Sequence, residues 1–140
     1  MVYECADDFQ SALACVVEDS IDLDGASFET QQMLVVVNSK EVSNGYISAS
    51  QGSRIFGVES RLVLDSMTLS GGYSSNAMVG GGCVLLGVGA TLVAQSVVFQ
   101  DCSAVAQGGA IAAYESSTND LISSVLERCV AGIHGGSLYA

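Results

Sequence analysis

The chain has 140 residues, of which 49% are hydrophobic and 14% are charged, with 16 glycines and no proline. This length suits one domain with its own core, and the high hydrophobicity excludes an intrinsically disordered chain. The formal net charge of −11 leaves only four lysine and arginine residues. Nucleic-acid binding through a basic surface is therefore excluded, and binding to an anionic membrane surface is disfavoured.

The first residues show neither the basic region nor the apolar core of a signal peptide. We therefore expect either a chain that is not secreted by that route or one whose leader has been removed. No apolar run approaches the roughly 18 residues that a membrane-spanning helix requires.

Residues 7–18 are predicted to form a helix. Asp7 or Asp8 supplies an N-cap, and an apolar face then follows at helical spacing with Phe9, Leu13 and Val16. A short amphipathic helix before a repeat array is typical of a cap that covers the first coil. Residues 1–19 are therefore interpreted as an N-terminal helical cap.

Three short strands are predicted next. Residues 21–25 alternate apolar and acidic side chains, residues 33–37 form an apolar run, and Tyr46 follows an Asn-Gly turn signal. The Asp-x-Asp-Gly sequence at residues 22–25 is not an EF-hand, because Ser20 and Gln31 stand where that loop needs acids.

A pair of adjacent glycines recurs at equal spacing in the second half of the chain. The intervals are both 27 residues, between Gly81-Gly82, Gly108-Gly109 and Gly135-Gly136. Repetition at a fixed period is typical of stacked repeat architectures. The residues between the pairs form short β-rich runs bounded by turn residues, which indicates strands. Each repeat is predicted to be one coil of a parallel β-solenoid, with the glycines at a tight corner.

The repeats 81–107 and 108–134 match column by column. Phe99 falls on Leu126, and Val84 falls on Ile111. These matched apolar side chains are predicted to point inward, each stacked on its copy roughly 4.8 Å away in the next coil.

A looser copy of the repeat precedes these two. Residues 66–69 match residues 96–99 at an interval of 30. The segment 71–76 is interpreted as a slightly longer loop before the next coil, which is either a tolerated insertion or part of a binding face.

Five cysteines are present, without a C-x-x-C motif. This pattern signals neither a closed disulfide framework nor a zinc site. Cys102 and Cys129 occupy equivalent positions one coil apart, so we interpret them as a stack of two small buried residues, with a disulfide between them as the alternative. Cys83 is predicted to be packed.

Two motifs resemble a known family. Gly108-Gly109-Ala110-Ile111, preceded by residues 99–104, is similar to the paired GGAI and FxxN repeats of the chlamydial polymorphic outer membrane proteins. Residues 54–72 resemble the upstream coil of such proteins and of related surface adhesins. Cys102 and Cys129 depart from the second motif, because they stand where the family has Asn.

This resemblance covers roughly residues 45–140. It implies a right-handed parallel β-helix of the pectin-lyase-like kind, with a cell-surface or extracellular location. An organelle, or a peripheral subunit of a membrane complex, is the other location we consider. The prediction is thus an all-β single domain over residues 1–140, with about 4–5 coils in residues 20–140.

Catalytic chemistry finds little support in the repeats. The charged groups of residues 81–134 fall at different register positions, whereas general acid–base catalysis needs titratable groups gathered together. Asp101 falls opposite Arg128, which suggests a surface ion pair of little energetic weight. His134 is interpreted as a corner residue. We expect no enzymatic activity, no metal and no cofactor.

The chain stops as a new coil opens at residues 135–140. A solenoid end without a cap exposes unpaired backbone groups and apolar side chains, here Ile133, Leu138 and Tyr139. We therefore expect either further residues or a protein partner at this edge. The predicted function is a non-enzymatic scaffold or adhesin-like segment that binds other proteins within a larger assembly. The alternative is a carbohydrate-binding or carbohydrate-cleaving β-helix.

Overall fold

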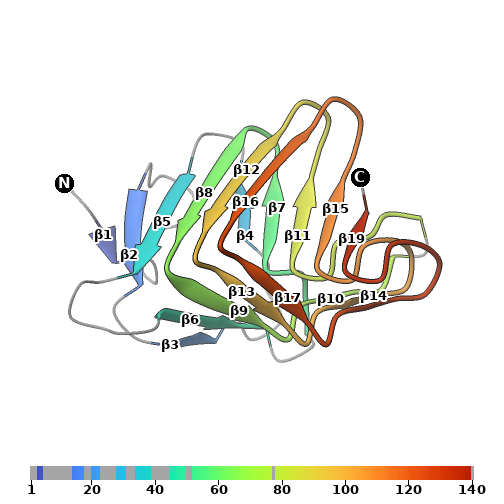
Figure 1. Cartoon of the computed structure of the whole chain (residues 1–140), viewed down its shortest axis with the longest axis horizontal. Helices are drawn as coiled ribbons and strands as arrows, with labels where there is room; N and C mark the ends of the chain where they lie inside the picture. The colour runs from blue at the N-terminus through green and yellow to red at the C-terminus, as the bar shows by residue number, and fades with distance from the viewer. Residues whose placement is uncertain are drawn as a thin grey trace.

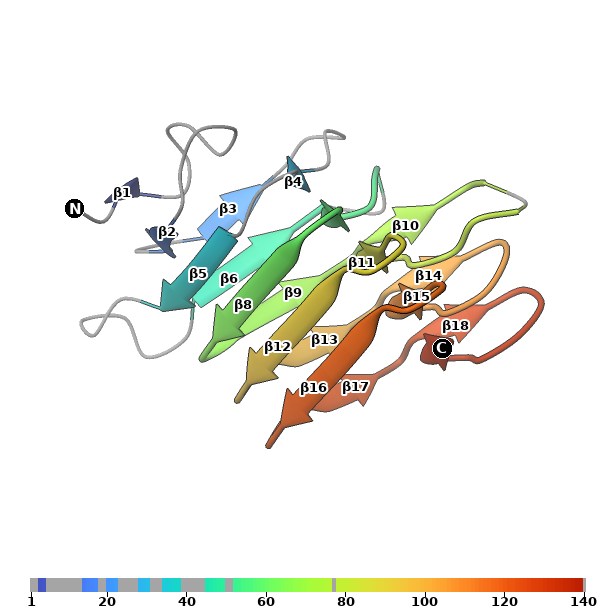
Figure 2. The same cartoon turned by 90° about the horizontal axis from the view of Figure 1, so that it is seen from above.

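The computed structural model describes residues 3–4, 14–17, 20–22, 28–30, 34–38, 45–49, 52–76 and 78–139, and before residue 47 it describes backbone strands only. Within these residues there are β-strands and no helix. Each strand pairs in parallel with its copy one turn further along the chain. Figures 1 and 2 show the chain winding repeatedly around one axis. The fold is a parallel β-solenoid, which confirms the predicted class.

Parallel pairing stacks the strands into four sheets. The first sheet contains β1 (Tyr3–Glu4), β2 (Ala14–Val17), β5 (Leu34–Asn38), β8 (Arg61–Asp65), β12 (Thr91–Gln95) and β16 (Thr118–Ile122). The second contains β3 (Ser20–Asp22), β6 (Gly45–Ser48), β9 (Met67–Ser70), β13 (Val98–Gln100) and β17 (Val125–Glu127). The third contains β4 (Phe28–Thr30), β7 (Phe56–Val58), β11 (Val84–Leu86), β15 (Ile111–Ala113) and β19 (Leu138–Tyr139). The fourth contains β10 (Tyr73–Ser74), β14 (Ser103–Ala104) and β18 (Val130–Ala131).

The described residues make about three complete turns, each with one strand in all four sheets. We name them the lower turn (β8 to β11), the middle turn (β12 to β15) and the last turn (β16 to β19). Strands β2 to β7 extend three of the sheets upstream. The predicted number of 4–5 coils is therefore too high, because it included a partial coil over residues 20–43 and the start of a coil at residues 135–140.

Residues that pair between adjacent turns are 27 positions apart in the third sheet, as the repeat interval predicts. Val84 pairs with Ile111, and Ile111 pairs with Leu138. Upstream, Thr68 pairs with Val98, which confirms the interval of 30. The interval shortens from 30 to 27 between β10 and β11, so the extra residues lie there. The predicted loop at residues 71–76 is therefore only partly right, because Tyr73 and Ser74 form β10 and only residues 75–76 fall in the longer connection.

The predicted helix at residues 7–18 is wrong over its last part. Residues 14–17 are strand β2, which pairs with β5. This short run ends in two β-branched valines, which fit a pleated sheet better than a helix, and its apolar spacing alone does not separate the two structures. Residues 3–4 of the predicted cap are also a strand, β1, which pairs with β2. The other residues of the cap lie outside the described residues.

The corners of the solenoid stack residues with positive φ. Ser66, Ser96 and Ser123 lie one above another with φ of 56°, 55° and 49°. This left-handed conformation is unfavourable for a residue with a Cβ by roughly 1–2 kcal/mol. The run from Thr91 to Phe99, which reads as one strand in the sequence, therefore bends at Ser96 into β12 and β13.

The core is a column of inward side chains that runs along the axis. Leu64, Leu69, Val84, Phe99 and Ile111 have no exposed surface, so the inward position predicted for Ile111 is confirmed. Burial of such side chains is the main stabilising contribution, at about 2 kcal/mol each. Within the described part of the chain there is no helix long and apolar enough to cross a membrane.

Candidate functional site

The double glycines play two separate roles at one corner. The first glycine of each pair is left-handed, with φ of 83°, 63° and 65° at Gly81, Gly108 and Gly135. The second is needed for close approach, because a Cβ on Gly109 would lie 2.3 Å from the carbonyl oxygen of Gly136 in the next turn. At Gly136 itself a Cβ would meet nothing within 4 Å. Within the described residues, the corner is therefore tightly packed at Gly82 and Gly109 but not at Gly136.

The last turn forms the candidate functional site. Its strands β16, β17, β18 and β19 are each the terminal strand of a sheet, so one side of every strand lacks a neighbouring strand among the described residues. Figure 2 shows these strands along one side of the molecule. We call this side the open edge.

Large apolar side chains are exposed on the last turn. Their exposed fractions are 45% for Ile122, 48% for Val125, 63% for Val130, 54% for Ile133 and 39% for Leu138. We call these five residues the edge patch. They lie on strands of all four sheets and in the connection after β18, so they are distributed around the last turn.

Two of the three residues predicted at this edge, Ile133 and Leu138, are in the edge patch. Tyr139 is instead partly buried, and its ring centroid lies 5.9 Å from that of Tyr114 in the preceding turn. The sequence reading missed Ile122, Val125 and Val130. The sequence carried a signal for them, because all three are large apolar residues in strands of the last turn, the turn that was predicted to be exposed.

Inward positions of the last turn are only partly covered. Leu126 stacks on Phe99, as predicted, but Leu126 keeps some exposed surface whereas Phe99 has none. Asn119 occupies the column of Leu92, and its buried Oδ1 has no hydrogen-bond partner. An unsatisfied buried polar atom is unfavourable by about 1–3 kcal/mol. The last turn is thus the least satisfied described part of the core.

A disulfide joins Cys83 of the lower turn to Cys102 of the middle turn, with a Cα–Cα distance of 5.5 Å. Both residues are fully buried, while Cys129 is a free thiol. The bond considered from the sequence, between Cys102 and Cys129, is therefore not the one formed. That reading compared only positions within one column, whereas the observed disulfide crosses between two columns of adjacent turns.

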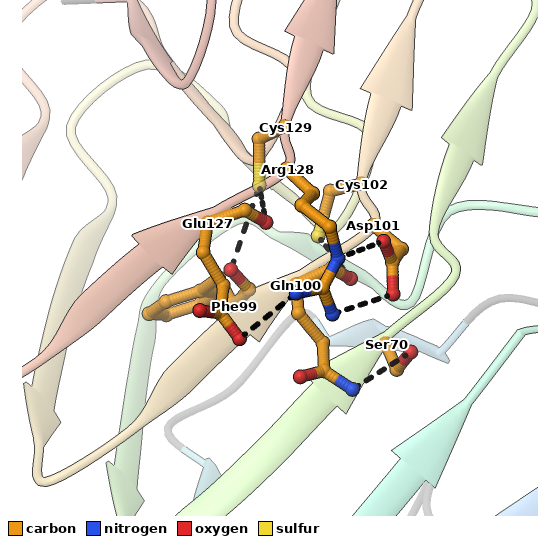
Figure 3. Close-up of polar contacts among 8 residues, drawn as sticks. All are labelled: Ser70, Phe99, Gln100, Asp101, Cys102, Glu127, Arg128 and Cys129. Atoms are coloured by element: carbon orange, nitrogen blue, oxygen red, sulfur yellow. Dashed lines mark hydrogen bonds and ion pairs between the residues drawn. The ribbon is translucent and has the colours of Figure 1, made fainter.

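Beside the cysteines, an ion pair joins the middle turn to the last turn (Figure 3). Arg128 donates through Nε to Asp101 Oδ1 at 2.7 Å and through Nη2 to Asp101 Oδ2 at 3.2 Å. This contact confirms the predicted pair. The hydrogen bond from Arg128 lowers the pKa of Asp101, while both side chains remain largely exposed.

A polar hollow of about 380 Å³ lies beside β10, lined by residues 52–54 and 73–76. Arg54 does not present a free charge there. Its guanidinium donates to the carbonyl oxygens of Gly80 and Gly81 at 2.9 and 2.8 Å and to Ser74 Oγ at 3.2 Å. Arg54 therefore anchors the longer connection between β10 and β11.

Among the described side chains, no group of three or more His, Cys, Asp or Glu residues is arranged to hold a metal ion. His134 lies exposed in the connection between β18 and β19, where its backbone forms a bridge with Gln107. It therefore sits at a corner, as predicted.

Comparison with protein families, with curated proteins and with solved structures gives no match for this chain. The parallel β-solenoid is established by the strand pairing itself. The resemblance of the repeats to the polymorphic outer membrane proteins therefore bears on the function only as a hypothesis.

Proposed function

We propose that this chain is a non-enzymatic structural module that binds another protein along the open edge of its last turn. The observation that carries the proposal is the edge patch, which places five exposed apolar side chains on the last turn, where all four strands are terminal strands of their sheets. Backbone groups on such an edge can pair with an added strand, and neighbouring side chains then select the partner.

The edge lacks some of the features that usually block strand addition. Protective edges carry proline, lysine or bulges, but β16 to β19 contain neither proline nor lysine. The one arginine of this turn, Arg128, is bound to Asp101. The short β17, β18 and β19, with three, two and two residues, limit pairing there, so β16, with five residues, offers the main edge for an added strand.

The charge of the last turn indicates the chemistry of the partner. Asp120 lies exposed on β16, Glu127 is partly exposed on β17, and Glu115 lies exposed before β16. We propose an extended protein segment in which apolar side chains alternate with basic ones. Such a segment would cover the edge patch and complement the acidic groups.

The resemblance of the repeats to polymorphic outer membrane proteins supports an adhesin-like variant of this proposal, in which the chain is one part of a surface-exposed β-helix. A scaffold role within a larger assembly uses the same edge. Both variants predict the same binding surface and share one test.

The test is binding of a fluorescent peptide of alternating valine and lysine, measured by anisotropy. We expect saturable binding that Val130→Lys weakens at least about tenfold, since it places in the edge patch a positive charge that repels the lysines of the peptide. Val88→Lys is the matched control, because Val88 is 69% exposed but lies on the β11–β12 turn, outside the edge patch. Equal loss in both variants would show non-specific attraction. No binding, together with a monodisperse monomer by light scattering at high concentration, would refute the proposal.

Carbohydrate binding is a second candidate, favoured by the polar hollow beside β10. Tyr73 offers a ring there, and Ser75 and Asn76 line the same hollow. Asn76 Oδ1 already accepts hydrogen bonds from the backbone N–H groups of Met78 and Val79, which reduces what the hollow can offer a sugar. A glycan array comparing the wild type with Tyr73→Ala tests this candidate, and a reducing-sugar assay tests for cleavage.

A further inference from the structure

Cys129 lies directly over one end of the Cys83–Cys102 disulfide. The residues that flank Cys102 pair with those that flank Cys129, at Gln100 with Glu127 and at Ser103 with Val130. The N–H of Val130 also donates to the carbonyl oxygen of Cys102 at 2.9 Å. Figure 3 shows Cys129 and Cys102 stacked on adjacent turns.

From this stacking we infer that the three cysteines form a thiol–disulfide exchange site. The Cys129 thiolate attacks Cys102 Sγ. The Cys102–Cys129 bond forms as the Cys83–Cys102 bond breaks, and Cys83 leaves as a thiolate that takes up a proton from solvent, equivalent to the one lost by Cys129. One disulfide and one thiol are present before and after, so no oxidant or reductant is consumed.

The geometry allows the Cys129 thiolate to attack Cys102 but not Cys83. Cys102 is one turn from Cys129, roughly 4.8 Å away, which is within the range of Cα distances that a disulfide tolerates. Cys83 lies one turn lower still, because its N–H bonds to Ala110 of the middle turn and its carbonyl accepts from Ile55. A direct Cys83–Cys129 bond would span two turns, about 10 Å, and is excluded.

The exchange moves the covalent link from one pair of turns to the next. In the observed state it joins the lower and middle turns, and the half-buried thiol is on the last turn. After exchange it would join the middle and last turns, with a fully buried thiol at Cys83. The site would therefore fasten the turn that carries the open edge. This inference does not depend on the proposed function.

Exchange depends on the Cys129 thiolate. Burial raises the pKa of the Cys129 thiol, and the nearby carboxylates of Asp101 and Glu127 raise it further. Arg128 also flanks the site, but its guanidinium is bound to Asp101. The thiol donates weakly to the carbonyl oxygens of Glu127 and Phe99, at sulfur–oxygen distances of 3.3 and 3.5 Å. The thiol form prevails at neutral pH, and exchange accelerates as pH rises.

One tryptic digest distinguishes the two states. Trypsin cleaves after Arg61 and Arg128, which releases Cys129 on residues 129–140 and leaves Cys83 and Cys102 together on residues 62–128. The oxidised chain is incubated at neutral and mildly alkaline pH, then denatured with N-ethylmaleimide and digested. The observed state gives two separate peptides with the label on Cys129. The exchanged state gives one disulfide-linked pair with the label on Cys83.

As long as the pH is below the pKa of the Cys129 thiol, we expect the linked pair to form about tenfold faster for each unit by which the pH is raised. Cys83 that stays unlabelled after a day at about pH 8.5, while Cys129 is labelled, would overturn the inference.

Two matched variants test the stacking separately, after refolding in a glutathione redox buffer. Cys83→Ala is expected to link Cys102 to Cys129, whereas Cys102→Ala is expected to leave Cys83 and Cys129 as thiols. Circular dichroism checks that both variants fold. Two free thiols in a folded Cys83→Ala, or a Cys83–Cys129 bond in Cys102→Ala, would contradict the proposed geometry.

Discussion

The middle turn and the last turn carry the same 27-residue pattern in different surroundings. Phe99 and Leu126 are paired neighbours in one column, yet Phe99 is fully buried and Leu126 is not. Gly109 has no room for a Cβ, whereas its counterpart Gly136 has open space. In a solenoid, the environment of a residue is thus determined by the turn above it as much as by its own strand.

The largest expected difference between the two turns is at Ile111 and Leu138, which pair in one register. Ile111→Asp should lower the free energy of unfolding by about 4 kcal/mol or prevent folding, because it buries an unpaired charge and removes core contacts. Leu138→Asp should lower it by less than about 1 kcal/mol, since Leu138 is 39% exposed. Urea denaturation followed by circular dichroism measures both. Equal losses would show that the two positions are equally buried.

The disulfide should have the next largest effect. It closes a loop with a sequence separation of 19 residues, so replacing both Cys83 and Cys102 by alanine should reduce stability by about 3 kcal/mol. Reduction of the wild type with dithiothreitol should produce a similar loss. An unchanged urea midpoint after reduction would mean that the lower and middle turns are held together by their strands alone.

Replacing the second glycine of each pair by alanine tests how much space the middle and last turns leave for a Cβ. Gly109→Ala should cost about 2 kcal/mol, because its Cβ would collide with backbone atoms of Gly136 and Val130. Gly136→Ala should change stability by less than about 0.5 kcal/mol. Thermal melts of the two variants provide the measurement. A destabilised Gly136→Ala would indicate that the open edge is covered.

The smallest effect is expected at the ion pair between these turns. The pKa of Asp101 is lowered by Arg128, so the stabilisation is present above the unfolded-state pKa and is lost as pH falls through the lower folded-state pKa. Asp101→Asn should therefore be slightly less stable than the wild type at neutral pH and equally stable well below about pH 4. A difference that persists in acid would point to a contact other than the ion pair.

The repeat interval allowed much of the fold to be predicted. Strand register, the inward position of Ile111 and the facing of Asp101 and Arg128 all follow from laying one repeat on the next. These properties are periodic, so a sequence with no alignment still reveals them.

Features that cross between columns or depend on local bends were missed. The Cys83–Cys102 disulfide joins different columns of adjacent turns, and the bend at Ser96 requires a left-handed serine, for which serine is not a usual signal. The strand at residues 14–17 was misread because its apolar spacing fits a helix as well. Pairing with β5 decides that region, and such pairing is invisible in a short run of sequence.

The most direct test of the open edge is amide hydrogen exchange of the dilute chain, resolved by residue. If the last turn is uncovered, amides of β16 and β17 should exchange about 100-fold faster than their register partners in β12 and β13. That result would show that the middle turn is protected by a neighbour that the last turn lacks. Equal protection of the two turns would contradict the account, because it would mean that the edge proposed for partner binding is already closed.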